Sequence, residues 1–379
     1  MAGIYIHIPF CKKACHYCDF HFVVSQKNKD AVIDAIVNEL EFQPDYLKGD
    51  LVNTIYFGGG TPSLLEEKHV KEILKSIRFD YNLSSNPEIT FEANPDDLDF
   101  DKLQMLYDQG VNRLSIGIQT FHDPHLKWLN RAHSSQEAEA CIQQARKVGF
   151  ENISMDLIYA LPSKDHSIWK DDLKRIVELQ PEHLSSYCLT IEPKTAFGNW
   201  LSKGKIEEID EDYAAEQFEI LLEAADRYGY EQYEISNFAQ PGYESLHNSN
   251  YWRHEKFLGV GPAAHSYDGK NRQANVSNNT KYLKSIERGE LPFELIPLTK
   301  EDQVNEYILT SLRTKWGCDL DRLKSKYDVD LLESRQMYLT DLLNQGMIFI
   351  EDGFITLTNN GKLLADKIAS DLFILDPKG

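Results

Sequence analysis

The chain has 379 residues, 42% of them hydrophobic and 26% charged, which is the composition of an ordinary globular protein with a full core. Its net charge of −20 excludes nucleic-acid binding as the main function, because that contact needs a basic surface. The same charge argues against electrostatic docking on an anionic membrane.

The termini and cysteines indicate where such a chain works. No apolar run reaches the ~20 residues that cross a bilayer, so no transmembrane segment is predicted. The first residues alternate as a strand does and lack the basic leader of a secretion signal. Three of the six cysteines, Cys141, Cys188 and Cys318, are scattered singly, which is not a disulfide framework. We therefore expect a cytoplasmic protein.

Strand-like and helix-like segments alternate over the first 240 residues. The strand-like runs are residues 3–8, 53–57, 88–93, 113–118, 153–159 and 184–190. Segments with the apolar period of a helix lie at 29–42, 136–150 and 211–228. This alternation predicts βαβ units and a parallel sheet in the α/β class. Polar residues follow the strand ends, as they do at the mouth of a barrel, so a partial (β/α)6 barrel is favoured over a doubly wound sheet.

The remaining chain is predicted to contain two further parts. Residues 241–298 are rich in glycine, asparagine and aromatic side chains and are interpreted as an irregular, functional connecting segment. From Thr299 helices resume and end in two short strands around an Asp352-Gly353 turn, which predicts a winged-helix-like α+β domain over 299–379. Its 14 acidic and 10 basic residues favour a structural or partner-docking role over DNA binding.

Three cysteines with the spacing C-x3-C-x2-C form the strongest motif: Cys11, Cys15 and Cys18. A closed structural zinc site and an ordinary electron-transfer cluster both require four ligands. Three cysteines on a [4Fe–4S] cluster leave one iron open to a small molecule. The alternative is a Cys3His zinc site that uses His16 or His21, although no second ligand pair occurs elsewhere in the chain.

This loop resembles that of the radical S-adenosylmethionine (SAM) enzymes, in which an aromatic residue precedes the last cysteine. Tyr17 has that position. The resemblance extends through the segments YIHIPFC, YFGGGTPS (56–63), FEANP (91–95), RLSIGIQ (113–119), LNRAH (129–133) and SMDLIYALP (154–162). It covers most of residues 1–240 and points to the branch that contains oxygen-independent coproporphyrinogen III dehydrogenase and the HemW haem chaperones.

The resemblance implies a [4Fe–4S] cluster on the three cysteines and SAM at its open iron. It also implies the residues that contact SAM: Tyr5, Tyr17, Gly59, Gly60, Thr61, Glu92, Gln119, Arg131 and Asp156. The chemistry agrees at two of these positions. A carboxylate such as Glu92 suits the amino or ribose end of SAM, and the planar fork of Arg131 suits a carboxylate.

Two features separate the chaperone from the dehydrogenase. Phe20 stands where the dehydrogenase has a fourth cysteine, and the arm that precedes the dehydrogenase barrel has no counterpart here. The segment HNSNYW (247–252) matches the signature of the HemW family, which the resemblance associates with haem. His247 is therefore the predicted haem ligand, because imidazole is a common axial ligand, and Cys188, His254 and His265 are other candidates.

We thus expect a haem chaperone that transfers haem to acceptor haem proteins. We expect transient contact with membrane-bound acceptors, and the sequence is compatible with a homodimer. Porphyrinogen decarboxylation is not expected. The alternative is the dehydrogenase reaction itself. A third reading, a winged-helix regulator with a metal sensor, conflicts with the acidic charge.

Overall fold

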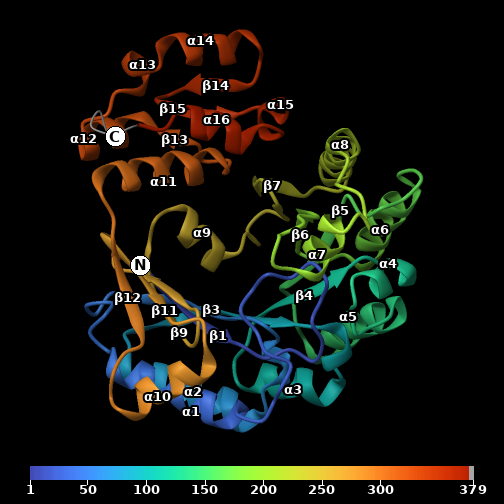
Figure 1. The fold of residues 1–379 in the computed structure, drawn as a ribbon, viewed down its shortest axis with the longest axis vertical. Coiled ribbons are helices and arrows are strands. Elements are labelled where there is room, and N and C mark those ends of the chain that lie inside the picture. Colours follow the sequence, from blue (N-terminus) through green and yellow to red (C-terminus); the bar gives the residue numbers. More distant parts are fainter. Residues whose placement is uncertain (375–379) are drawn as a thin grey trace.

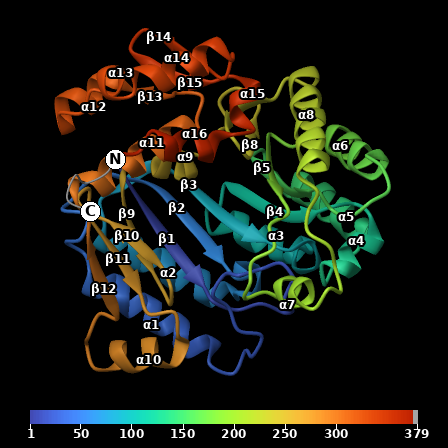
Figure 2. The same ribbon diagram turned by 45° about the horizontal axis from the view of Figure 1, so that its top comes forward.

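The computed structural model describes residues 1–374. A 12-stranded sheet forms the larger part, and a three-stranded sheet belongs to a smaller C-terminal part. Figures 1 and 2 show the C-terminal part over one end of the large sheet, with helix α9 (Leu246–Trp252) between the two.

Six parallel strands in chain order form the centre of the large sheet: β1 (Ala2–Ile8), β2 (Val52–Gly59), β3 (Leu83–Ala93), β4 (Arg113–Gln119), β5 (Ile153–Tyr159) and β6 (His183–Cys188). The helices that accompany them are α1 (Lys29–Phe42), α2 (Glu67–Asp80), α3 (Phe100–Asp108), α4 (Asp123–Trp128), α5 (Ser135–Val148), α6 (Ser167–Leu179), α7 (Ala196–Ser202) and α8 (Glu211–Arg227). Two short 3-10 turns follow β2 and β3, namely η1 (Pro62–Leu64) and η2 (Pro95–Asp97). The predicted α/β fold is confirmed.

The six parallel strands do not close on one another. On their outer sides β1 pairs with β9 (Lys256–Val260) and β6 pairs with β8 (Asn237–Ala239). The arrangement is therefore an open, partial barrel, as the sequence predicts, and Figure 2 shows its curved strands from the side.

The two faces of the parallel strands differ in chemistry because side chains alternate along a strand. In β1, Ile4, Ile6 and Ile8 are fully buried in the main hydrophobic core. The same core contains the apolar faces of α1 and α2. The opposite face carries polar side chains, and it faces the interior of the partial barrel.

Residues 241–298 differ from the irregular connection that the sequence suggested. They contain α9, β9, β10 (His265–Tyr267), β11 (Asn271–Asn275), α10 (Asn279–Glu287) and β12 (Phe293–Pro297), and the strands extend the sheet beyond β1. Just before them, β7 (Glu231–Glu234) and β8 form the other edge. These strands are short, and β9 pairs with a strand some 250 residues away, so a local pattern gives little sign of them.

The C-terminal part has its own hydrophobic core. Its elements are α11 (Lys300–Leu312), β13 (Cys318–Asp319), α12 (Leu320–Tyr327), α13 (Leu331–Ser334), α14 (Gln336–Asn344), β14 (Ile348–Glu351), β15 (Phe354–Leu357), α15 (Asn359–Lys362) and α16 (Ala365–Asp371). Asp352 and Gly353 both have positive φ, at 50° and 83°. These values suit the tight turn of a hairpin. The two predicted strands are present on either side of it as β14 and β15.

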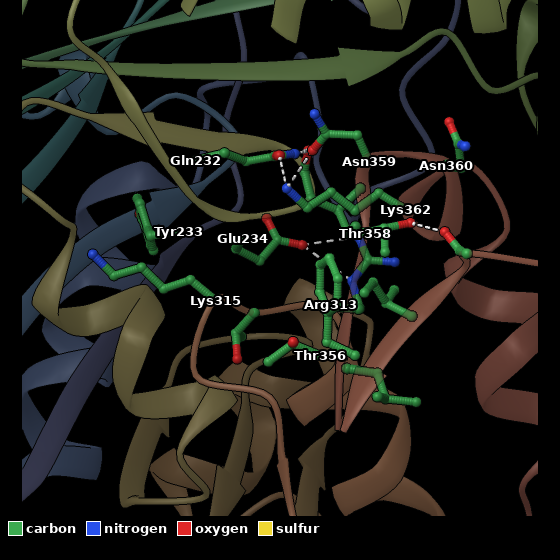
Figure 3. Close-up of a pocket in the computed structure, with 16 residues that line it drawn as sticks. Gln232, Tyr233, Glu234, Arg313, Lys315, Thr356, Thr358, Asn359, Asn360 and Lys362 are labelled. Atoms are coloured by element: carbon green, nitrogen blue, oxygen red, sulfur yellow. Dashed lines mark hydrogen bonds and ion pairs between the residues drawn. The ribbon is translucent and has the colours of Figure 1, made fainter. Parts of the chain in front are cut away.

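A cavity of about 700 Å³, lined by both polar and apolar residues, lies between β7 and the C-terminal part (Figure 3). On its wall the side chains of Arg313 and Glu234 form an ion pair at 2.9 Å, and Lys362 donates a hydrogen bond to Gln232. Contacts of this kind fix the C-terminal part against the sheet edge. Among residues 1–374, no helix has both the length and the apolar character required to span a membrane.

Candidate functional site

A cavity of about 510 Å³ opens at the carboxyl ends of the parallel strands. Its wall brings together residues that are far apart in the sequence. Of the residues predicted to hold the cluster and SAM, it includes Cys11, Cys15, Cys18, Tyr17, Gly59, Gly60, Thr61, Glu92, Gln119, Arg131 and Asp156. Two other predicted residues, Tyr5 and His247, are not on this wall.

The cysteine loop follows β1 and is fastened at several points. The backbone N–H of Cys11 donates to the carbonyl of Val23, and that of Val23 donates to Pro9, so the loop returns to its own start. Farther along the loop, the N–H of His16 donates to the Leu129 carbonyl. Because both ends and the middle are held, the three thiols face the cavity from a defined backbone.

The two histidines of the zinc alternative point elsewhere. Nδ1 of His16 is hydrogen-bonded to the Trp128 carbonyl, and its ring packs against Trp200 at 4.6 Å. Nε2 of His21 is hydrogen-bonded to Asn279. Neither residue lines the cavity that the cysteines line.

The distances between the three thiol sulfur atoms can be compared with those around a single zinc ion. Thiolates on one tetrahedral zinc lie roughly 3.8 Å apart, given bonds of about 2.3 Å. Within residues 1–374, no group of three possible ligands that includes these cysteines has its ligand atoms all within 4.8 Å of one another. In this structure the three sulfur atoms are therefore not gathered as closely as three thiolates around one zinc ion.

Burial makes free thiolates costly in this loop. It raises the pKa of Cys11 to about 11 and that of Cys18 to about 12. A bound iron cation would compensate the charge of each thiolate, because metal ligation and thiol deprotonation are coupled. The residues present therefore fit an iron–sulfur cluster.

Arg131 is the cation beside the loop. Its Nη1 lies 3.5 Å from the sulfur of Cys15 and 3.5 Å from the hydroxyl of Tyr17. Its Nη2 donates to the Asn94 side chain at 2.5 Å and to the Gly117 carbonyl at 2.8 Å. The guanidinium is thus held in one orientation at the edge of the cysteine loop, where it can contact a carboxylate.

Two half-buried carboxylates, Glu92 and Asp156, also line the cavity. Burial raises the pKa of Glu92 to about 7 and that of Asp156 to about 6. Glu92 accepts a hydrogen bond from the hydroxyl of Tyr56 at 2.8 Å. Asp156 accepts from the hydroxyls of Ser115 and Ser154 at 3.1 Å. Such carboxylates would gain from a cationic ligand, which compensates the charge that burial penalises.

The glycine run after β2 serves the protein backbone as well as the cavity. Gly59 has φ +105°, a conformation that other residues rarely adopt. A Cβ on Gly60 would lie 2.7 Å from the carbonyl oxygen of Phe10 and 2.8 Å from that of Ile8. The run therefore allows the root of the cysteine loop to pack directly on the end of β2.

The two predicted residues outside the wall are buried inside the partial barrel. The Tyr5 hydroxyl is hydrogen-bonded to Nδ1 of His7 at 3.2 Å, and its ring stacks on Tyr56. His247 is 1% exposed. Its Nδ1 is hydrogen-bonded to Thr54 and its Nε2 to Tyr251, each at 2.8 Å.

Several residues of the cavity were not anticipated: Tyr56, Asn94, Ser115 and Ser185. Three of them have a signal in the sequence. Polar residues recur with period two along the strands, as in Thr54 and Tyr56 or Arg113 and Ser115. This period places them all on the inner face.

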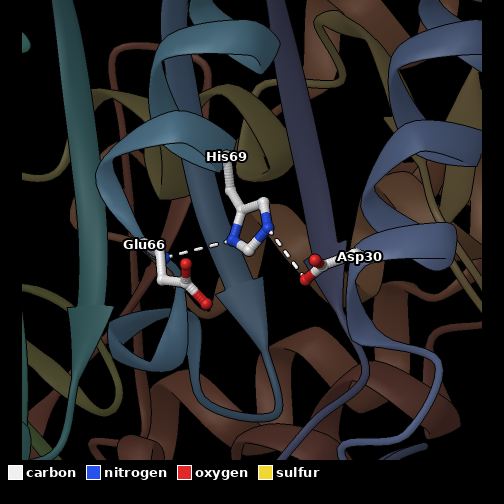
Figure 4. Close-up of side chains that lie close together, drawn as sticks. All are labelled: Asp30, Glu66 and His69. Atoms are coloured by element: carbon white, nitrogen blue, oxygen red, sulfur yellow. Dashed lines mark hydrogen bonds and ion pairs between the residues drawn. The ribbon is translucent and has the colours of Figure 1, made fainter.

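Outside the cavity, Asp30, Glu66 and His69 form a close group of possible metal ligands (Figure 4). Nδ1 of His69 accepts a hydrogen bond from the backbone N–H of Glu66, and its Nε2 faces Asp30 at 3.2 Å. Both ring nitrogens are thus used to cap α2 and join it to α1. This group is explained by helix packing.

Comparisons with known proteins agree with this geometry. Residues 5–176 match the model of the radical SAM superfamily, and residues 298–364 match that of the HemN C-terminal domain. The fold is similar to the solved structure of coproporphyrinogen III oxidase (HemN) from Escherichia coli, with a TM-score of 0.84 and 24% identity over 98% of this chain and 90% of that one.

Curated relatives are similar over nearly the whole chain. Heme chaperone HemW from Bacillus subtilis is 37% identical, covering 97% of this chain and 98% of the relative. The protein of that name from Lactococcus lactis is 34% identical, covering 98% of this chain and 97% of the relative. That from Escherichia coli is 38% identical, covering 77% of this chain and 80% of the relative. Fold and cavity thus define a protein of the radical SAM superfamily. Within it, the chain belongs to the HemW family.

Proposed function

We propose that this protein is a haem chaperone of the cytoplasm that binds haem and passes it to acceptor haem proteins, some of them membrane-bound. The observation that carries the proposal is the full-length similarity to proteins named heme chaperone HemW, in a chain whose three loop cysteines share one cavity. The proposal also divides the chain into the barrel over 1–240, a connecting segment over 241–298 whose strands extend the sheet, and the C-terminal domain over 299–379. A homodimer is part of the same proposal.

Cys11, Cys15 and Cys18 would hold a [4Fe–4S] cluster, which would supply an open iron for SAM and an electron for its reduction. The chain's own residues bind and orient that ligand. Arg131 would bind its carboxylate, and the half-buried carboxylates Glu92 and Asp156 would bind its cationic and hydroxyl-bearing parts. Tyr17, Gly59, Gly60, Thr61 and Gln119 would complete the pocket.

Haem binding and porphyrinogen chemistry are tested on the same preparation. The full chain is reconstituted with iron and sulfide without oxygen, haemin is titrated, and the Soret band is followed. Coproporphyrinogen III, SAM and a reductant are then added, and the porphyrin products are analysed. Stoichiometric haem binding without protoporphyrinogen formation is expected.

A variant with alanine at Cys11, Cys15 and Cys18 separates haem from the cluster. We expect it to lose iron and sulfide, and any haem that it still binds is bound independently of the cluster. Formation of protoporphyrinogen at an enzymatic rate by the wild type would overturn the chaperone proposal. So would the absence of a saturable Soret band.

A further inference from the structure

The H-N-x-x-Y-W segment forms helix α9, and the start of this helix is fixed inside the partial barrel. The carboxylate of Glu88 accepts hydrogen bonds from the backbone N–H groups of Leu246 and His247 at 3.0 and 2.9 Å. The Ser245 hydroxyl accepts from the N–H of Asn248. These contacts satisfy the free N–H groups of the first turn, so α9 has a defined position under the cavity.

The imidazole of His247 has no free nitrogen in this position. Nδ1 is hydrogen-bonded to the Thr54 hydroxyl and Nε2 to the Tyr251 hydroxyl, and the ring is 1% exposed. An iron ligand needs one nitrogen free and open to the metal. Ligation here would require one of these hydrogen bonds to break and the buried ring to become accessible to the iron.

The same ring packs on Tyr56, which is hydrogen-bonded to Glu92, and on Tyr251. Its centroid lies 5.0 Å from that of Tyr56, with an interplanar angle of 27°, and 4.9 Å from that of Tyr251 in a perpendicular arrangement. The Tyr56 hydroxyl in turn donates to Oε1 of Glu92 at 2.8 Å. A continuous set of contacts thus runs from His247 through Tyr56 to a carboxylate on the cavity wall.

We propose that His247 is a positioning residue for Glu92: it holds Tyr56 and Tyr251 so that the carboxylate keeps its orientation in the cavity. The proposal rests on the proposed function, because Glu92 is assigned there to SAM. It gives the motif a role at the SAM pocket instead of at the haem iron.

Glu92 also has other neighbours, which a titration must take into account. The N–H of Gly59 donates to its carboxylate. Charged or titratable groups on five strands, the cysteine loop and α9 interact electrostatically with Glu92. They are Tyr5, Cys11, Tyr56, Arg113, Asp156, Tyr187 and Tyr251. Variants that change only Tyr56 or His247 leave the remaining groups in place.

The test measures SAM affinity as a function of pH on cluster-reconstituted full-length protein, by equilibrium dialysis. The hydrogen bond from Tyr56 lowers the pKa of Glu92, so Tyr56→Phe should move the midpoint of SAM binding to higher pH. We expect affinity near neutral pH to fall about tenfold. His247→Ala should move the midpoint in the same direction, and His247→Gln should restore part of the change because an amide can keep a hydrogen bond.

Haem titrations of the same variants give the second readout. His247→Ala should retain the stoichiometry and position of the Soret band, whereas Cys188→Ala and His265→Ala report on the other candidate ligands. His69→Ala and Tyr81→Phe are matched controls, because both side chains are buried away from the cavity. They should leave the SAM midpoint unchanged.

The proposal is overturned if His247→Ala loses the Soret band while its SAM midpoint stays that of the wild type. If this variant does not fold, the midpoint of SAM binding is measured in Tyr251→Phe and Tyr56→Phe instead, because both substitutions preserve the ring packing. A midpoint shift in both supports the proposal, and no shift in either overturns it. Failure of the proposed function is distinct, because the wild type itself would then bind no SAM or no haem.

Discussion

At the scale of single residues, Gly60 shows how tightly the cysteine loop is joined to the sheet. Its N–H donates to the Ile8 carbonyl at 2.8 Å, and a Cβ would meet the backbone of Phe10 and Ile8. Backbone cannot move aside as a flexible side chain can. We expect Gly60→Ala to lower the free energy of unfolding by about 1–3 kcal/mol and to reduce iron retention after reconstitution.

Iron content per chain and urea unfolding check this prediction. Gly49→Ala is the matched control: a Cβ there meets no atom within 4 Å, but φ is +74°, so the substitution strains the backbone far from the loop. The control should lose stability and keep iron. Equal iron loss in both variants would show that the effect is general instability.

The thiols of the cavity are also expected to differ from one another. Cys188 lines the same cavity as the three loop cysteines, but it lies at the end of β6 and outside their motif. We expect Cys11→Ala, Cys15→Ala and Cys18→Ala each to abolish the visible absorption and the iron content of the reconstituted protein. Cys188→Ala should retain both, and loss of iron in this variant would contradict a cluster held by the loop alone.

How much of the cavity could be predicted depends on whether the signal is local. Glu92 lies near the end of a predicted strand, Gln119 follows one and Asp156 lies within one, and the structure brings all three to one wall. Tyr56 and Asn94 gain their roles from contacts with Glu92 and Arg131 on other strands and loops. Local sequence contains no sign of such pairs. Whether these residues contact SAM stays a prediction.

At the scale of elements, α1 is joined to the segment after β9 through one buried carboxylate. Glu39 is fully buried and accepts hydrogen bonds from the Tyr282 hydroxyl, the Asn275 amide and the N–H of Gly261, at 2.5, 2.7 and 2.7 Å. Despite these donors, burial raises the pKa of Glu39 to about 7. The contact fixes the added strands, which carry no strong pattern of their own, against a strongly patterned helix.

A Glu39→Gln variant tests this contact and its pH dependence. The amide N–H₂ would face donors, so we expect a cost of about 2–4 kcal/mol near pH 5. A carboxyl group whose pKa is raised on folding keeps its proton longer in the folded state, so its contribution to stability falls as pH rises from about 4.5 to about 7. The cost of the substitution should therefore shrink above pH 7.

Urea unfolding at pH 5 and pH 8 measures that difference. Glu41→Gln, two residues along α1 and exposed, is the matched control and should show no comparable cost. A cost for Glu39→Gln that grows with pH would mean that the folded state binds the ionised carboxylate in preference to the neutral acid.

The elements themselves were predictable to different degrees. The helix predicted over 29–42 has those bounds in the structure, and the six central strands begin and end within a few residues of the predicted ones, apart from an earlier start of β3. Their apolar runs are long and pack on one core. The edge strands β9–β12 are three to five residues long and depend on pairing with β1 and each other. They are too short for their length or their hydrophobic period to predict them from the sequence.

At the scale of the whole molecule, α9 and Arg313 join the barrel to the C-terminal part. The end of α9 contacts that part directly, because Arg253 lies over the ring of Trp316 at 4.2 Å and Nε2 of His254 is hydrogen-bonded to Thr310. Arg313 pairs with Glu234 of β7 and with Asp366 of α16. The side chain of Glu234 is only 1% exposed, so this ion pair is largely buried on the Glu234 side.

We therefore expect Arg313→Ala to lower the free energy of unfolding by about 3 kcal/mol, because a buried carboxylate is left without its cation. Limited proteolysis should also cut the connection before α11 faster, since the C-terminal part would be held less firmly. Arg288→Ala is the matched control: Arg288 and Glu290 form an ion pair in which both side chains are more than half exposed, and such pairs contribute little. If Arg313→Ala is no less stable than this control, the ion pair does not hold the two parts together. The contact would then depend on the backbone hydrogen bonds between residues 233–235 and residues 313–315.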